Sequence, residues 1–212
     1  MGVSVVKTDL SSGKYKNKKG LCRRFGMDST KPLFSFIGRL VHEKGADLLP
    51  AIIYKSLLKN DINILILGEG KAEIESELRS LKIHFKDNYA FEIGFNEGLA
   101  HLIYAGSDFL LMPSRAEPCG LNQMYALRYG TIPIVRRTGG LNDTVVDIGD
   151  GGFGICHVQA TVKDVCDSID RAMKLFKNKN EFKKIRQKGM RIDHSWDNSA
   201  KEYLTLYKSL TP

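Results

Sequence analysis

Two cationic side chains, Arg39 and Lys44, lie five residues apart in a segment that begins with Gly38 and ends with Gly45. Both side chains can converge on one anion, and the glycines let the backbone approach that anion closely. The segment therefore predicts a phosphate-binding turn. Taken alone, it is equally consistent with two surface charges that flank a loop. The histidine within it, His42, is too unspecific a signal to be assigned a ligand contact.

A second mixed set of side chains lies in segment 113–120, which reads Pro-Ser-Arg-Ala-Glu-Pro-Cys-Gly. A helix is expected to begin directly after it, at Leu121 and Asn122, and the free backbone N–H groups at a helix N-terminus attract anions. Glu117 is then placed to hydrogen-bond the hydroxyl groups of whatever is attached to a bound phosphate. Considered singly, Glu117 is equally an exposed loop carboxylate, and Cys119 is better interpreted as a small buried hydrophobic residue. A loop this mixed in residue type is better explained by a ligand.

The segment Gly68-Glu69-Gly70 is a third candidate, because a Gly-x-Gly after a buried strand begins the dinucleotide-binding fingerprint. The segment lacks the third glycine and the spacing of that fingerprint. Turn glycines are the better interpretation, and a dinucleotide-binding oxidoreductase ranks last among the functions considered.

Short β-rich runs alternate with helical patterns through the middle of the chain. Strands are expected at residues 33–37, 62–67, 89–93, 109–112 and 132–135. Each run is apolar almost throughout, which is typical of strands covered on both faces of a parallel sheet. The alternation predicts an α/β fold: a Rossmann-like, doubly wound parallel sheet flanked by helices, with ligands bound beyond the C-terminal ends of the strands. The three candidate segments should therefore lie at that edge of the sheet.

The pattern loosens after Val135 into glycine-rich turns around residues 138–140 and 149–152, before a short strand near residues 153–158. Helices then close the chain. Thr161 is expected to cap the first of them, and the residue after segment 121–129, Gly130, is expected to end an earlier one. Later helices are expected at residues 180–190 and about 196–210, with Trp196 as a packing anchor for the last.

Four motifs, in the same order, resemble the C-terminal half of bacterial glycogen synthases and plastid starch synthases, which are retaining glycosyltransferases of the GT-B fold. The motifs are Gly38-Arg39-Leu40 with Lys44-Gly45; Pro-Ser-Arg-x-Glu-Pro-Cys-Gly-Leu at 113–121; Tyr-Gly-Thr-x-Pro at 129–133; and Val-Arg-Arg-Thr-Gly-Gly-Leu-x-Asp-Thr-Val at 135–145. The resemblance spans roughly residues 17–207. Glu-Pro-Cys-Gly-Leu together with Arg-Arg-Thr-Gly-Gly-Leu separates this family from the broader group of retaining glycosyltransferases with two Rossmann-like domains.

The resemblance implies a donor-binding domain for ADP-glucose or ADP. The parent enzyme would transfer α-glucosyl units to the non-reducing end of an α-1,4-glucan with retention. Catalytic roles are implied for Arg39 and Lys44, which would hold the donor diphosphate and stabilise it as it leaves, and for Glu117, which would bind the glucosyl group. Donor-binding roles are implied for Gly38, Phe95, Cys119, Gly120, Leu121, Asn122, Thr138, Gly139 and Gly140.

These donor-binding roles differ in kind. Phe95 would stack on the nucleobase, where tyrosine is common in the family. The backbone amides of Cys119 and Gly120 would reach the sugar hydroxyls, and those of Leu121 and Asn122 would donate to the diphosphate. Residues 138–140 would lie close to the sugar and the phosphate.

Two positions depart from the pattern of the broader group. Tyr125 stands where a second glutamate often binds the ribose, so the ribose must be held differently here. Asn122 stands where threonine is frequent, which leaves the backbone donor intact. No Asp-x-Asp occurs in the chain, which argues against a metal-bridged donor. We expect no metal and no cofactor, because Arg39 and Lys44 supply the cations.

Composition and charge bear on other classes. The longest apolar runs are far shorter than the roughly 20 residues of a membrane helix. The four cysteines form no Cys-x-x-Cys pair, and no histidines have metal-ligand spacing. The net charge of +8 is concentrated in segments 14–24 and 174–191, where it interleaves with apolar residues at helical spacing. That pattern predicts solvated helix faces. We expect no nucleic acid or membrane partner, and a cytoplasmic or plastid-stromal location.

Members of the family are roughly twice as long, because a separate N-terminal domain carries the acceptor glucan site. We find no counterpart of it, so we expect a donor-half fragment that binds donor weakly and does not turn over alone. Residues 1–12 are expected to form a tail or interdomain linker, 13–194 a nucleotide-sugar-binding Rossmann-like domain, and 195–212 a closing C-terminal helix. Two alternatives stay open: the donor domain of another retaining glycosyltransferase that uses a UDP-sugar, and a non-catalytic nucleotide-sugar-binding module.

Overall fold

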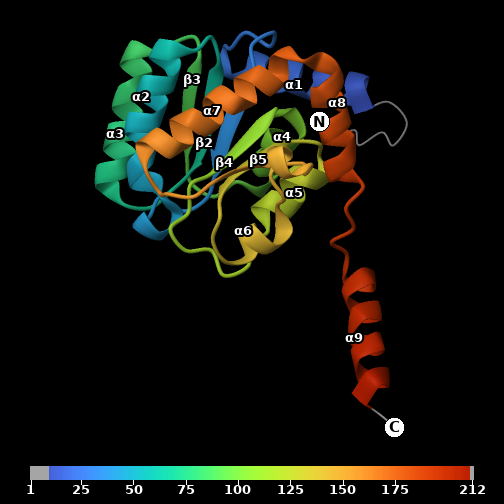
Figure 1. Ribbon diagram of the computed structural model, residues 1–212. Coiled ribbons are helices and arrows are strands. Elements are labelled where there is room, and N and C mark those ends of the chain that lie inside the picture. Colours follow the sequence, from blue (N-terminus) through green and yellow to red (C-terminus); the bar gives the residue numbers. More distant parts are fainter. Residues whose placement is uncertain (1–9, 211–212) are drawn as a thin grey trace.

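The computed structural model describes residues 10–210. A parallel sheet with the strand order β3-β2-β1-β4-β5-β6 lies at its centre (Figure 1). The strands are β1 (Leu33–Ile37), β2 (Asn63–Gly68), β3 (Tyr89–Ile93), β4 (Phe109–Met112), β5 (Ile132–Arg136) and β6 (Ile155–His157). This is the strand order of the doubly wound dinucleotide-binding fold, and it confirms the predicted fold class.

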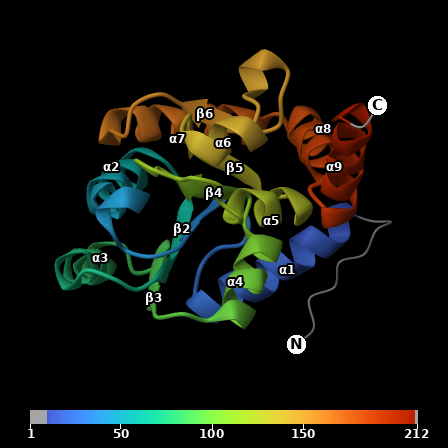
Figure 2. The same cartoon turned by 90° about the horizontal axis from the view of Figure 1, so that it is seen from below.

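Helices cover both faces of the sheet. They are α1 (Leu10–Phe25), α2 (Leu49–Lys59), α3 (Ala72–His84), α4 (Glu97–Gly106), α5 (Asn122–Arg128), α6 (Gly139–Thr144), α7 (Val162–Lys177) and α8 (Lys179–Met190), whereas a further helix, α9 (Trp196–Leu210), contains no buried residue. Figure 2 shows α2 and α3 on one side of the strands and α1 and α4 on the other. The apolar side chains of α7 join the same core as those of α2 and α3.

The central strand β1 explains why the strand runs lack polar alternation. Phe34 and Phe36 pack into the core shared with α2, α3 and α7. Leu33 packs into the core shared with α1 and α4. Because both faces of the strand are buried, its residues are apolar except Ser35, whose hydroxyl donates to the carbonyl oxygen of Phe109 at 3.3 Å.

Local signals set several helix ends. Thr161 Oγ1 accepts a hydrogen bond from the backbone N–H of Asp164 at 3.2 Å, so the predicted cap of α7 is confirmed. Gly130 follows α5 with φ 67°, in the left-handed region that a residue just past a helix often adopts. Its predicted role at the end of that helix is also confirmed.

The sheet changes its winding direction between β1 and β4. β1 pairs with β2 on one edge and with β4 on the other. In doubly wound sheets the helices after such a pair of strands lie on opposite faces, and a crevice opens beyond the carboxyl ends of the strands. The segments that leave β1 and β4, at residues 38–45 and 113–121, meet at this position.

The structure differs from the sequence-based expectations at the two ends of the chain. Residues 10–12 belong to helix α1 rather than to a tail, while residues 1–9 lie outside the described part. Residues 211–212, at the end of the predicted closing segment, also lie outside it. Trp196 was predicted to anchor α9 by packing, and this is wrong, because its side chain is 86% exposed. Helix α9 contains no buried residue and extends away from the sheet in Figure 1.

Two further expectations also fail. The predicted turn at Gly139-Gly140 is the first turn of helix α6. The basic segment 14–24 is helical as expected, but it is not a uniformly solvated face, because Lys14 and Lys18 are buried. Among residues 10–210, none of the helices is both long enough and apolar enough to span a bilayer.

Candidate functional site

The turn after β1 lies directly against the segment that leaves β4. Gly45 has φ 68°, and a Cβ atom at this position would lie 2.2 Å from the carbonyl oxygen of Pro113. Only glycine allows this backbone conformation and this close approach together. The backbone N–H of Arg115 donates to the carbonyl oxygen of Glu43 at 2.8 Å and fastens the two segments. The predicted phosphate-binding turn, residues 38–45, and the segment that leaves β4, residues 113–121, therefore pack together as one unit.

An ion pair holds the same two segments on their outer side. The guanidinium of Arg115 binds the carboxylate of Asp47 in a bidentate manner, with N–O distances of 2.6 and 2.9 Å. Partial burial raises the pKa of Asp47, but the hydrogen bond and charge of Arg115 outweigh it and leave that pKa below its ordinary value. Arg136, at the end of β5, donates to the carbonyl oxygen of Arg115 at 2.7 Å. Arg115 and Arg136 thus brace the site.

The two predicted catalytic residues Lys44 and Glu117 form the centre of this arrangement. Nζ of Lys44 lies 2.6 Å from each carboxylate oxygen of Glu117. Ser114 Oγ donates to one of the same oxygens at 3.3 Å. The Glu117 side chain is only 8% exposed, and a carboxylate buried to that extent needs a partner charge. The two strand exits are thus brought together by this pair, whereas the ligand-binding roles of both residues stay predictions.

The turn that follows β5 packs on the backbone of Glu117. A Cβ atom on Gly139 would lie 2.2 Å from the carbonyl oxygen of Glu117, and the backbone N–H of Gly140 donates to that oxygen at 3.0 Å. Thr138 is the residue before helix α6 and is partly buried. Residues 138–140 therefore lie beside Glu117, whereas their contact with a sugar or a phosphate stays a prediction.

Other predicted residues line a cavity of about 240 Å³ at the same edge of the sheet, and neither Lys44 nor Glu117 is part of its wall. Gly38, Arg39, Phe95 and Asn122 all contribute to its wall. Phe95 is 86% exposed, so one face of its ring is available for stacking. The Asn122 amide donates to the carbonyl oxygen of Ile37 at 2.7 Å, which fixes the start of α5 beside β1.

Arg39 differs from the other charged residues of the site. Its side chain is exposed and lines the cavity. Within residues 10–210 its guanidinium forms no ion pair or hydrogen bond with another side chain, whereas Arg115 and Lys44 are both paired. A cation with unused donors at the mouth of a cavity is well suited to a ligand anion.

The segment around Cys119 is an exposed turn. Cys119 is solvent-exposed, so its interpretation as a small buried hydrophobic residue is wrong. Gln123 donates to the carbonyl oxygens of Cys119 and Gly120, at 3.1 and 3.0 Å, and braces the turn. Leu121 is 59% exposed and directly precedes α5. The amide contacts predicted for these residues stay predictions.

Sequence reasoning missed the two other polar side chains of the cavity wall. Glu69, interpreted only as part of a glycine turn, and Asn96 both contribute to the wall. The signal was available, because these residues follow β2 and β3 at the same edge of the sheet. His42 does not line this cavity. Its backbone carbonyl oxygen accepts a hydrogen bond from the Arg115 guanidinium at 2.9 Å and helps to hold that side chain in place.

Tyr125 occupies the position at which a ribose-binding glutamate is frequent. Its ring lies 5.7 Å from that of Tyr104 and 6.0 Å from that of His101, measured between ring centroids. The ring is 44% exposed. The position therefore belongs to an aromatic cluster on α4 and α5.

Comparison with known proteins gives matches along most of the chain. A sequence model of the family described as glycosyl transferases group 1 matches residues 19–189. The chain is 61% identical over 197 residues to a glycogen synthase of Flavobacterium johnsoniae, a match that covers 92% of the chain and 42% of that relative. It is 45% identical over 206 residues to a glycogen synthase of Rhodospirillum rubrum, covering 95% of the chain and 42% of that relative.

A solved structure gives a similar result. The catalytic domain of starch synthase IV from Arabidopsis thaliana, bound to ADP and acarbose, superimposes with a TM-score of 0.86 at 37% identity. That match covers 95% of the chain and 43% of the starch synthase domain. The chain thus spans about 42% of the length of the two glycogen synthases, and it corresponds to the C-terminal half of the Flavobacterium protein.

Proposed function

The chain belongs to the group 1 glycosyl transferases, and we propose that it is the donor-binding half of a glycogen or starch synthase that uses ADP-glucose. In the proposed reaction, the bond between the anomeric carbon of glucose and the diphosphate breaks, and ADP leaves. A hydroxyl oxygen at the non-reducing end of an α-1,4-glucan forms the new bond on the same face and passes its proton to the departing diphosphate. The second half of the cleft, with the glucan site, would come from a further domain.

Arg39 and Lys44 would stabilise the departing diphosphate. Arg39 lines the cavity and has unused donors. Lys44 is the last residue of the short 3₁₀ helix His42–Lys44 on the same turn. Fixed cations aimed at a developing negative charge are a large term in catalysis, and removal of one such donor typically costs about a hundredfold or more in rate. These two cations supply the charge that a metal ion supplies elsewhere, so the proposal includes no metal and no cofactor.

Glu117 would bind the hydroxyl groups of the glucosyl unit. This role is supported by the contact between Lys44 and Glu117, which is the observation that carries the proposal. The contact places a phosphate-binding cation and a hydroxyl-binding carboxylate next to each other, as a sugar joined to a diphosphate requires. Ionised carboxylates have about four lone-pair directions, so Glu117 can accept from hydroxyl groups while Lys44 neutralises it.

The nucleobase would lie against Phe95. The ring is exposed on the wall of the cavity that Arg39 also lines. A nucleotide held there would extend from the base at Phe95 to the diphosphate at Arg39 and Lys44.

Because the relatives include bacterial glycogen synthases, we place the protein in the cytoplasm as part of the same proposal.

Calorimetry with ADP, ADP-glucose and UDP tests the proposal. We expect ADP and ADP-glucose to compete for one site and UDP to bind more weakly. Glu117→Gln should weaken ADP-glucose relative to ADP by about tenfold, because a charge-assisted hydrogen bond to the sugar is lost. The exposed Glu43→Gln, on the neighbouring turn, is the matched control and should leave this ratio unchanged. Tighter binding of UDP than of ADP would make the donor a UDP-sugar instead.

Glucan elongation provides a second test. Retaining transfer needs donor and acceptor held together in a closed, dry cleft. We therefore expect no elongation of glycogen by the chain alone. Sustained elongation from ADP-glucose by this chain would contradict the requirement for a second domain.

A further inference from the structure

A cavity of about 430 Å³ lies at the edge of the sheet opposite the candidate site. Its wall includes Thr30, shortly before β1, and Asp108, directly before β4. Because the strands are parallel, this wall lies at their N-terminal ends. The 240 Å³ cavity of the candidate site, called the donor cavity below, lies at their C-terminal ends. The volume is within the range of small-molecule sites, roughly 300–1,000 Å³.

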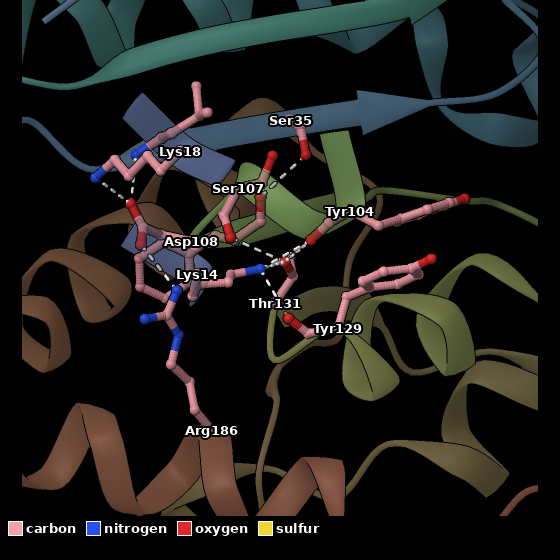
Figure 3. Close-up of polar contacts among 11 residues, drawn as sticks. Lys14, Lys18, Ser35, Tyr104, Ser107, Asp108, Tyr129, Thr131 and Arg186 are labelled. Carbon is pink, nitrogen blue, oxygen red and sulfur yellow. Dashed lines mark hydrogen bonds and ion pairs between the residues drawn. The ribbon is translucent and has the colours of Figure 1, made fainter. Parts of the chain in front are cut away.

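One carboxylate at this edge is shared by two cations. Lys18 Nζ lies 2.6 Å from Asp108 Oδ2, and Arg186 Nη2 lies 3.0 Å from Asp108 Oδ1. The backbone N–H of Leu33 also donates to Asp108 Oδ2, at 2.9 Å. Figure 3 shows the Asp108 carboxylate between the side chains of Lys18 and Arg186. Both oxygens of the carboxylate are therefore occupied, and one negative charge faces two positive charges.

Lys14 lies beside this cluster and does not use the carboxylate. Its ammonium donates to the carbonyl oxygens of Tyr104 and Tyr129, at 2.8 and 3.0 Å, and to Thr131 Oγ1 at 2.5 Å (Figure 3). All three acceptors are uncharged. Burial holds the pKa of Lys14 well below its ordinary value, and the nearby charge of Arg186 lowers it further. The cluster thus has no second carboxylate to balance its cations.

Two more lysines extend the positive charge to the mouth of the cavity. Lys179 and Lys183 line it, and neither forms an ion pair within residues 10–210. Asp108 is the one acidic residue among the described residues of the wall. Burial lowers the pKa of the Lys179 ammonium; Asp108 opposes this, while Lys18 and Arg186 lower the pKa further. The wall therefore has more basic than acidic side chains, and Lys179 and Lys183 are its basic residues without an ion-pair partner or a backbone acceptor among the described residues.

The wall also has an apolar part and an unused donor. The rings of Phe176 and Phe182 meet edge to face, with 5.2 Å between their centroids. Nζ of Lys179 lies 3.6 Å from the centroid of Phe176. Nε of Arg186 is buried and has no hydrogen-bond partner among the described residues. A ligand with a multiply charged anionic group and a small organic part would match the cationic groups and the aromatic rings of this wall.

We propose that this cavity binds a dianionic phosphate group, either free or as a small phosphate ester, with Lys179, Lys183 and Arg186 as its donors. A phosphate dianion matches the excess of positive charge better than a carboxylate, which carries one charge. An organic substituent on the phosphate would lie against Phe176. The site is separate from the donor cavity, so the proposal does not depend on the donor being ADP-glucose.

Calorimetric titration with inorganic phosphate and with phenyl phosphate tests this site. We expect saturable binding that weakens with added salt. Lys183→Ala should weaken it by about tenfold, because a charged donor to the phosphate is lost. Lys179→Gln should have a similar effect. The matched control is Lys184→Ala, an exposed lysine next to Lys183 on α8 that does not line the cavity, and it should leave the affinity unchanged.

Further measurements distinguish a phosphate ester from free phosphate, and this cavity from the donor cavity. Tighter binding of phenyl phosphate than of inorganic phosphate would support an ester ligand, and equal binding would support free phosphate. The component of binding that Lys183→Ala weakens should be the same in Arg39→Ala as in the unaltered chain. Loss of that component in Arg39→Ala would place the anion in the donor cavity and overturn the proposal. So would an absence of saturable binding, or equal effects of Lys183→Ala and Lys184→Ala.

Discussion

Lys44 and Glu117 leave the sheet from different strands, and Nζ of Lys44 lies 2.6 Å from both carboxylate oxygens of Glu117. The turn after β1 and the loop after β4 are thereby joined by one ion pair at the point where the winding of the sheet reverses. The side chain of Glu117 is 8% exposed and that of Lys44 is 24% exposed. The pair is therefore a structural clamp in the free protein as well as the proposed centre of donor binding.

The clamp predicts a strong coupling between the two residues. Lys44→Met should lower the free energy of unfolding by about 2–3 kcal/mol, because it leaves a buried carboxylate without a positively charged partner. The double variant Lys44→Met/Glu117→Gln should lose clearly less than the sum of the two single variants. Urea denaturation of the four proteins measures this.

An exposed ion pair serves as the control for that cycle. Lys31 and Asp61 lie 2.7 Å apart, and Asp61 is 78% exposed. Their coupling should be within about 1 kcal/mol of zero, as for most surface pairs. Additive effects at Lys44 and Glu117, like those expected at the control pair, would show that the clamp does not form in solution.

Phe95 should contribute to nucleotide affinity through its ring. Phe95→Ala is expected to weaken ADP by about fivefold to tenfold, since aromatic stacking contributes about 1 kcal/mol beyond burial of area. Phe95→Tyr should bind as the unaltered chain does, because the ring is kept. Trp196→Ala removes an aromatic side chain of equal exposure, 86%, and is the control. Unchanged ADP affinity in Phe95→Ala would show that the base does not stack on Phe95.

The close approach at Gly45 can be separated from its backbone conformation. Gly45 and Gly26 both have φ 68°, but a Cβ atom would collide with Pro113 only at Gly45 and would meet open space at Gly26. Gly26→Ala should cost about 1 kcal/mol, the cost of a left-handed alanine. Gly45→Ala should cost about 2 kcal/mol more and weaken ADP, because the turn must shift. Equal losses of stability at the two positions in thermal unfolding would argue that the two segments are not docked.

The sequence identified the strands and the edge that carries the site because both have local causes. Strands buried on both faces are almost continuously apolar, as in residues 109–112, and in a parallel sheet their carboxyl ends meet at one edge. Arg39, Lys44 and Glu117 could therefore be assigned to one site before their side chains were placed. That Lys44 pairs directly with Glu117 could not be predicted, because the two residues are 73 positions apart and the contact depends on the docking of two turns.

The buried lysines of α1 show where the sequence was misleading. Lysine at helical spacing is normally a solvated residue, and Lys14 and Lys18 follow that pattern. Their burial depends on Asp108 and Thr131, which lie 90 and 117 residues further along the chain. A pattern confined to one helix contains no information about such partners. The prediction that Trp196 packs against the fold was wrong for the converse reason: a buried position was predicted and the residue is exposed. A large apolar residue indicates packing, but it does not identify a packing partner.

Asp147 gives a prediction for acid stability. Its carboxylate is 8% exposed, pairs with Arg171, and accepts hydrogen bonds from the backbone of Gly149 and Cys156. Burial raises its pKa, but these partners outweigh burial and lower it below the ordinary value. A carboxyl whose pKa is lowered by folding stabilises the protein above its unfolded pKa of about 3.9, and this contribution is lost as the pH falls through the lower folded value.

The variant Asp147→Asn should therefore be less stable by about 2 kcal/mol near pH 7. The difference from the unaltered chain should shrink as the pH falls below about 4. Urea unfolding at a series of pH values measures it. A difference that stays constant down to the lowest pH at which the chain is folded would mean that the charge of Asp147 contributes nothing.

The most direct test of the proposed donor site is the affinity for ADP in three single variants. Arg39→Ala and Lys44→Ala should each weaken ADP by about tenfold or more, because each removes a charged donor to the diphosphate. Lys44→Ala should have the larger effect, since it also leaves the Glu117 carboxylate uncompensated beside the phosphate. Lys55→Ala, an exposed lysine on α2, should bind as the unaltered chain does. Unchanged ADP affinity in both Arg39→Ala and Lys44→Ala would contradict the proposed site.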